Sequence, residues 1–72
     1  MSQAETDILL LFRRYQAKTS EMLFFSAGVA NSQTPQFKRA MQSLIERGLV
    51  TKETRHDAYS LTRAGFQASM SA

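Results

Sequence analysis

Cysteine and tryptophan are absent from these 72 residues, which also include one proline and three glycines. Without cysteine the chain has no disulfide and no thiolate metal site, which fits a reducing, cytoplasmic setting. Gly28, Gly48 and Gly65 are too far apart to form a loop that cradles a phosphate group. No repeat or linker divides the chain, so we expect a single domain over residues 1–72.

Long hydrophobic runs are missing as well. The longest, Ile8–Phe12, has five residues, whereas a membrane-spanning helix needs about 20. Arg13 and Arg14 follow this run, and no basic segment precedes it, which is the wrong order for an export signal. We therefore expect neither a membrane partner nor export.

Residues that could carry catalysis are few. His56 is the only histidine, and although Asp57 is its neighbour, no nucleophile completes a triad with this pair. One histidine and scattered carboxylates also do not make a set of metal ligands. The sequence therefore predicts a protein that is not an enzyme and that holds no metal or cofactor.

Positive charge is present and unevenly placed. Nine Lys and Arg residues against six Asp and Glu residues give a net charge of +3. Residues 1–33 carry three charges of each sign, so all of the excess lies in residues 34–63. A surface that binds a polyanion has such a distribution, although many small proteins reach +3 by chance.

The first helix is expected over residues 3–16. Ser2 and Glu5 have the spacing of a capping box at its start. A helical period places five residues on one face, and these are Ala4, Ile8, Leu11, Phe12 and Tyr15. Leu10 lies nearly opposite this face, beside Ala17, and so leaves an exposed apolar position.

A short second helix is expected over residues 21–27. Thr19 and Ser20 are candidate N-caps for it, and Gly28 is suited to end it in a left-handed conformation. Val29 would then fold back on the core, and residues 30–33 would form a polar turn.

The second half carries the clearest local signals. Thr34 and Pro35 form an N-cap and a first-turn proline for a helix over 35–47, which Gly48 ends. The apolar period then changes from helical to alternating, which predicts a hairpin with strands over 50–55 and 59–61. Thr62 can cap a last helix over 63–70, from which Ala64 and Phe66 would pack back. The expected fold is mainly α with a small β-hairpin, in the order helix, helix, helix, hairpin, helix.

Two segments of this second half resemble winged helix-turn-helix regulators of the broad MarR-like kind. Residues 37–50, FKRAMQSLIERGLV, are similar to the recognition helix of these proteins and its exit, and residues 59–65, YSLTRAG, to the end of their wing. The resemblance covers residues 19–70. It implies a DNA-binding protein whose third helix enters the major groove while the wing contacts the DNA backbone or minor groove. The spacing from Gly28 to the third helix exceeds the usual tight turn, and the long flanking helices of many members are missing.

Candidate DNA contacts follow from the outward positions of residues 34–47 and from the polar residues of the hairpin. Arg and Lys pair with guanine, Gln with adenine, and Ser and Thr with either bases or phosphates. The candidates are Thr34, Gln36, Lys38, Arg39, Gln42 and Ser43 on the helix and Lys52, Arg55 and His56 on the hairpin.

The expected partner is double-stranded DNA, in regulation of transcription or another DNA transaction. A homodimer is expected as well, in which Leu10 packs on its twofold mate together with Leu9 and Ala17. One alternative places Leu10 under the C-terminal helix of a monomer. A second alternative, of another functional class, is a winged-helix module that docks an acidic protein partner without reading DNA.

Overall fold

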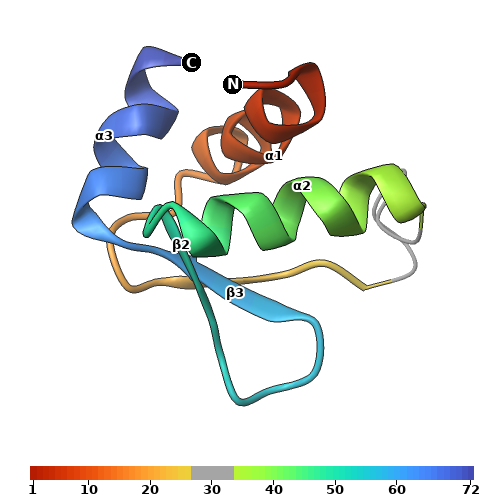
Figure 1. Ribbon diagram of the computed structural model, residues 1–72. Helices are drawn as coiled ribbons and strands as arrows, with labels where there is room; N and C mark the ends of the chain where they lie inside the picture. The colour runs from red at the N-terminus through yellow and green to blue at the C-terminus, as the bar shows by residue number, and fades with distance from the viewer. Residues whose placement is uncertain (27–33) are drawn as a thin grey trace.

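The computed structural model describes residues 1–26 and 34–72. The described elements are the helices α1 (Gln3–Arg14), α2 (Pro35–Glu46) and α3 (Arg63–Ser71) and the strands β1 (Met22–Phe24), β2 (Val50–Lys52) and β3 (Ala58–Leu61). The strands form one antiparallel sheet in the order β1-β3-β2. Figure 1 shows the helices gathered on one side of this sheet, with the two chain termini close together. The described chain is therefore a mixed α/β domain, with more sheet than the sequence predicted.

The helices around the hairpin form where the sequence predicted them. The side-chain oxygen of Thr34 accepts a hydrogen bond from the Phe37 amide, which caps α2. At the other end Gly48 has φ +76°, the left-handed conformation that glycine adopts most readily. The hairpin β2–β3 is also confirmed, although its first strand ends at Lys52 rather than at residue 55 as predicted. In its connection Asp57 takes a left-handed φ of 58°, a conformation that aspartate tolerates better than most residues.

The predicted second helix is wrong. Residues 22–24 are strand β1, which pairs with β3 through Met22 opposite Ser60 and Phe24 opposite Ala58. Thr19 and Ser20 cap no helix; the Ser20 amide donates instead to the Leu61 carbonyl. A short apolar run suits a helix or a strand equally, and the unpaired edge of β3 decides in favour of the strand. The expected roles of Gly28 and Val29 and the turn over 30–33 lie outside the described residues.

Helix α1 is two residues shorter than predicted, and its buried face is displaced. It ends at Arg14, so Tyr15 lies outside the core at 61% exposure. Gln16 then takes a φ of 58°, and the amide of Ala17 donates to the carbonyl of Phe12 as the chain reverses. Within α1 the buried residues are Glu5, Ile8, Leu9 and Phe12.

The core lies between the sheet and the helices. It is built mainly by α1 and α2, with one or two residues from each strand. Phe25 lies at its centre, with ring centroids 5.3 Å from Phe12, 5.6 Å from Phe37 and 5.7 Å from Tyr59. These tilted and edge-on ring contacts fix the position of α2 relative to both α1 and the sheet.

Thr62 connects three elements at the base of the hairpin. Its hydroxyl donates to the Gly48 carbonyl at 2.6 Å and accepts from the Gly65 amide at 3.0 Å. Its own amide donates to the Leu49 carbonyl at 3.1 Å. The predicted cap of α3 is thus confirmed, and the same residue fastens the start of α3 to the end of α2. Phe66 packs partly on the core as predicted, whereas Ala64 is exposed.

Candidate nucleic-acid interface

The outer face of α2 carries the cations expected to contact DNA. Lys38 and Arg39 are exposed, and neither side chain makes a hydrogen bond or ion pair with another described residue. Gln42 is exposed nearby and its amide nitrogen lies 3.5 Å from a carboxylate oxygen of Glu46. These positions lie within one arc of the helix because residues three and four apart share a face. The face can therefore present to a ligand two cations that have no partner among the described residues, and one amide.

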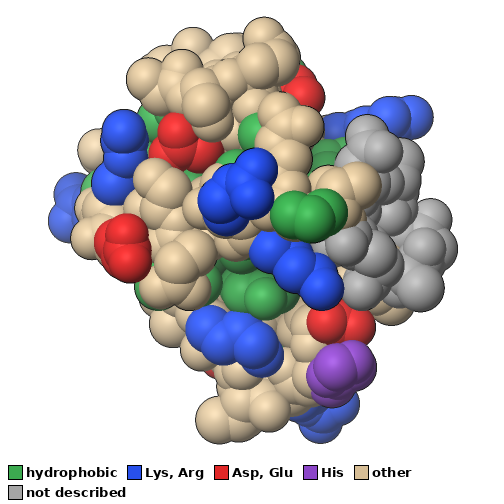
Figure 2. Space-filling model, turned by 45° about the vertical axis from the view of Figure 1, so that its right-hand side comes forward, with side chains coloured by type: hydrophobic (Ala, Val, Ile, Leu, Met, Phe, Trp, Pro, Cys, Tyr) green, Lys and Arg blue, Asp and Glu red, His purple; other side chains and the backbone are tan. Residues whose placement is uncertain are grey.

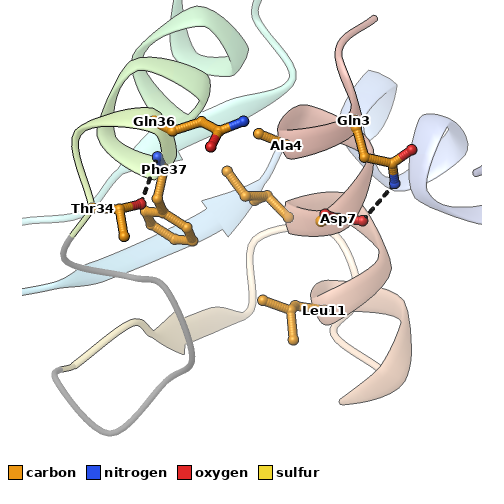
Figure 3. A pocket seen from close by; sticks show the side chains of 8 residues that line it. Gln3, Ala4, Asp7, Leu11, Thr34, Gln36 and Phe37 are labelled. Atoms are coloured by element: carbon orange, nitrogen blue, oxygen red, sulfur yellow. Dashed lines mark hydrogen bonds between the residues drawn. The ribbon is translucent and has the colours of Figure 1, made fainter.

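Two other predicted contacts lie at the flank of α2, where it meets α1. A pocket of about 220 Å³ lies between α1 and the start of α2. Thr34 and Gln36 line part of it (Figure 3). Gln36 points across this pocket toward Ala4 of α1. The Thr34 oxygen is used by the helix cap described above. Thr34 thus serves the helix cap, whereas Gln36 lies at the junction of the two helices and lines a second pocket there together with Arg39.

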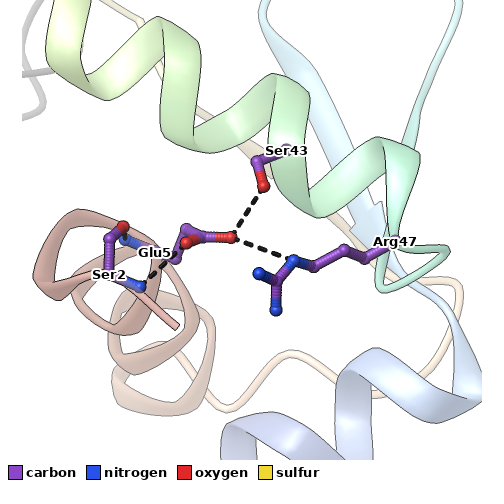
Figure 4. A network of polar contacts seen from close by, with 4 residues as sticks. All are labelled: Ser2, Glu5, Ser43 and Arg47. Carbon is purple, nitrogen blue, oxygen red and sulfur yellow. Dashed lines mark hydrogen bonds and ion pairs between the residues drawn. The ribbon is translucent and has the colours of Figure 1, made fainter.

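Ser43 is directed into the protein. Figure 4 shows its hydroxyl donating to Oε2 of Glu5 at 2.9 Å, while Nε of Arg47 lies 3.5 Å from the same oxygen. The other carboxylate oxygen, Oε1, accepts from the Ser2 amide at 2.8 Å, so the predicted capping box is present. The expected DNA contact by Ser43 is therefore corrected, because its donor is already used by a buried carboxylate.

This network sets the charge state of Glu5. The carboxylate belongs to a residue only 5% exposed, and burial alone would raise its pKa. The Ser2 backbone hydrogen bond, the Ser43 and Ser2 hydroxyls and the Arg47 charge outweigh burial and lower the pKa of Glu5 to about 2. Glu5 therefore stays ionised at neutral pH and holds α2 on α1. Sequence reasoning found its capping role but missed its contacts with α2, which lie 38 and 42 positions along the chain.

Three DNA contacts were predicted on the hairpin. One of them, Lys52, makes hydrogen bonds within the turn, and the other two are exposed. Nζ of Lys52 donates to the Glu53 carbonyl at 2.7 Å and to the Arg55 carbonyl at 3.0 Å, and it lies 5.2 Å from the centre of the Tyr59 ring. Lys52 therefore closes the turn. Arg55 is exposed without a polar partner among the described side chains. His56 is 95% exposed at the side chain and lies 3.1 Å from the Asp57 carboxylate.

The charges on this side of the molecule are interspersed. Figure 2 shows Lys and Arg side chains spread over the face with acidic side chains between them, and His56 at its lower right. Cations spread in this way can contact a phosphate backbone at several separate points, but on this face they do not form one continuous basic patch. Within the described ranges, no three histidine or acidic side chains lie close enough together to hold a metal ion.

The predicted dimer surface is reduced to one of its three residues. Leu9 is fully buried and Ala17 is 8% exposed, and both belong to the core of this chain. The expectation that they meet a twofold mate is therefore wrong, because their surfaces are already covered. Leu10 is 38% exposed, as its position on the helix predicts.

None of the described helices combines the length and the apolar character needed to cross a membrane. Comparison of the chain with known protein families, with characterised proteins and with solved structures finds no match.

Proposed function

We propose that this protein binds duplex DNA as a small winged-helix protein, with α2 in the major groove and the β2–β3 hairpin on the adjacent backbone. The observation that carries the proposal is the pair Lys38 and Arg39 on the outer face of α2, whose side chains bond to none of the residues that the structure describes. A hairpin follows this helix directly and presents Arg55 and His56 near its tip. The MarR-like resemblance of residues 37–50 and 59–65 supports the same reading, in which the protein regulates transcription or assists another DNA transaction.

The size of a single α-helix and the fixed position of α2 support this mode of binding. The major groove of B-DNA, about 12 Å wide, admits one α-helix, and cations on the helix surface reach guanine edges or flanking phosphates. The Glu5–Ser43–Arg47 network and the ring contacts of Phe25 hold α2 firmly against the rest of the domain. A fixed helix loses little conformational entropy on binding.

Binding of labelled random-sequence duplex, measured by fluorescence anisotropy over a salt series, tests the proposal. We expect affinity to fall steeply with added salt, because Lys and Arg displace counterions from phosphates. Arg39→Ala should weaken binding by about 5- to 150-fold, corresponding to about 1–3 kcal/mol. The control is Arg13→Ala on α1, which should change affinity little. Equal effects of the two changes would contradict a role for α2.

A second candidate is a module that docks an acidic protein partner. The observation in its favour is Glu46, which lies beside Gln42 on the outer part of α2 and would repel the unbroken row of phosphates along a groove, whereas a protein partner can place a neutral or basic group opposite it. Glu53 and Asp57 likewise dilute the positive charge of the hairpin. A protein captured through Lys38 and Arg39, together with the absence of salt-dependent duplex binding, would favour this candidate.

A further inference from the structure

Among the residues that the structure describes, strand β1 lies at an edge of the sheet. In the order β1-β3-β2, β3 is the one strand that pairs with β1 among residues 1–26 and 34–72. The Phe25 amide donates at 2.8 Å to the carbonyl of Asp57, the residue opposite it. Bonded and non-bonded pairs alternate along an antiparallel ladder, so Leu23 also directs its backbone groups to β3. The amides and carbonyls of Met22 and Phe24 therefore point to the open edge.

The side chains at this edge are apolar and exposed. Met22 is 44% exposed and Phe24 46%, and Tyr15, at the end of α1, is 61% exposed. Together with Leu11, Leu23 and Phe25 they line a groove of about 300 Å³. Residues 22–25 contain no charge and no proline, the two commonest devices by which proteins protect an edge strand from pairing. This edge therefore offers apolar side chains and unprotected backbone groups to a further strand.

We propose that a second copy of this chain covers it, with β1 pairing antiparallel to β1 of that copy about a twofold axis at Leu23. In this register Met22 lies opposite Phe24 of the second copy, and Phe24 opposite its Met22. These are the residues whose backbone groups face outward, so the two pairs form four hydrogen bonds between the copies. The result is a continuous six-stranded sheet.

The side chains fit this occupant. Each Met22 lies beside a Phe24 ring on the outer face of the sheet, a contact that thioethers and aromatic rings favour. The two Leu23 side chains meet at the groove and exclude water from it. Glu21 falls opposite Phe25 of the second copy, so no like charges are placed in register. The strand is therefore complementary to itself, which a twofold interface requires.

The surface area buried between the two copies indicates how strongly they associate. With about 200 Å² for a whole aromatic side chain, the exposed parts of Tyr15, Met22 and Phe24 offer roughly 250–300 Å² per copy. The pair buries much less than the roughly 1,200 Å² of a stable complex, even when the backbone is added. The dimer is therefore weak in free solution. The proposal goes beyond DNA binding and holds whether or not the protein binds DNA.

Sedimentation equilibrium of the whole chain without DNA, at concentrations into the millimolar range, measures this association. Met22→Lys and Phe24→Lys should each weaken it at least about tenfold. Leu10→Lys places the same charge on an exposed leucine of α1 and should leave it unchanged. Circular dichroism tests whether each variant is folded. If Phe24→Lys unfolds, the effect of Met22→Lys on the association alone tests the proposed pairing.

Amide hydrogen exchange on the wild type gives a test that needs no variant. The Met22 and Phe24 amides should gain protection as the concentration rises, while the Leu23 amide, bonded to β3, should stay equally protected throughout. A chain that remains monomeric into the millimolar range overturns the proposal. So does a dimer in which these two amides gain no protection, or one that Leu10→Lys dissociates and the β1 variants do not.

Discussion

Ser43 of α2 donates its hydroxyl hydrogen to the Glu5 carboxylate of α1 across 2.9 Å, and this bond joins the middle of one helix to the first turn of the other. Arg47 approaches the same oxygen one turn further along α2. The orientation of the helix that we propose to enter the major groove therefore depends on the charge of a single buried acid.

Acid should weaken the fold through Glu5. Its pKa is about 2 in the folded chain, below the ordinary value of 4.5, so the folded state binds this proton less readily than the unfolded state. The contribution is fully present above about pH 4.5 and is lost as the pH falls toward 2. Its upper bound is about 3 kcal/mol, from 1.36 kcal/mol per pKa unit.

The matching variant is Glu5→Gln, which should lower the free energy of unfolding at pH 7 and flatten its decline between pH 4.5 and 2. Glu46→Gln, an exposed acid on α2, is the control and should keep the decline of the wild type. Urea denaturation at a series of pH values measures both. A wild-type decline that persists in Glu5→Gln would assign it to other carboxylates.

Two glycines should respond differently to alanine. A Cβ at Gly65 would lie 1.8 Å from the Leu49 carbonyl oxygen, a backbone atom that cannot move away alone. We expect Gly65→Ala to cost about 3 kcal/mol or more. A Cβ at Gly48 meets no atom within 4 Å, so Gly48→Ala carries only the strain of a left-handed φ, about 1–2 kcal/mol. Thermal unfolding of the two variants checks the order, and a milder effect at Gly65 would contradict this packing of α3.

Substitutions of the two hairpin cations should have different effects on the stability of the fold and on DNA binding. Lys52→Met removes the ammonium that holds two turn carbonyls and should destabilise the fold by about 1 kcal/mol. Arg55→Ala should change stability by less than about 0.5 kcal/mol. In duplex binding, Arg55→Ala should reduce the salt dependence by about one phosphate contact. Equal losses of stability in the two variants would show that Arg55 also supports the turn.

Thr62 should matter more than an ordinary N-cap. Thr34→Val removes the cap of α2 and should cost about 1 kcal/mol. Thr62→Val removes both the cap of α3 and the bond to the Gly48 carbonyl, and should cost about 2 kcal/mol. Chemical denaturation of the two variants under the same conditions compares these losses. Identical losses would mean that the bond to Gly48 adds nothing to stability.

Much of the fold could be predicted because its signals are local. The capping box at Ser2, the Thr34–Pro35 start of α2, the Gly48 stop and the Thr62 cap each involve residues within a few positions of one another. The change of hydrophobic period after Gly48 likewise needs only the neighbouring sequence to predict β2 and β3.

The rest depended on contacts far along the chain. Met22–Phe24 became a strand because β3 offers it a free edge nearly 40 positions away, whereas the local sequence offered two acceptable helix caps. Ser43 lies at the margin of the outward arc of α2, and only the buried Glu5 turns it inward. Leu9 is buried and Tyr15 is exposed, which is the reverse of the prediction, and the reason is similar. The helical period of α1 does not fix how the helix is turned about its own axis; its contacts with the sheet and α2 do.

The bonds around Thr62 couple the local stability of α3 to that of the hairpin. The end of α2, the beginning of β2 and the first turn of α3 all meet at this residue, which itself follows β3 directly. Displacing Thr62 would deprive the carbonyls of Gly48 and Leu49, and the amide of Gly65, of their partner at the same time. Local opening of the first turn of α3 and of the base of the hairpin should therefore occur together rather than independently.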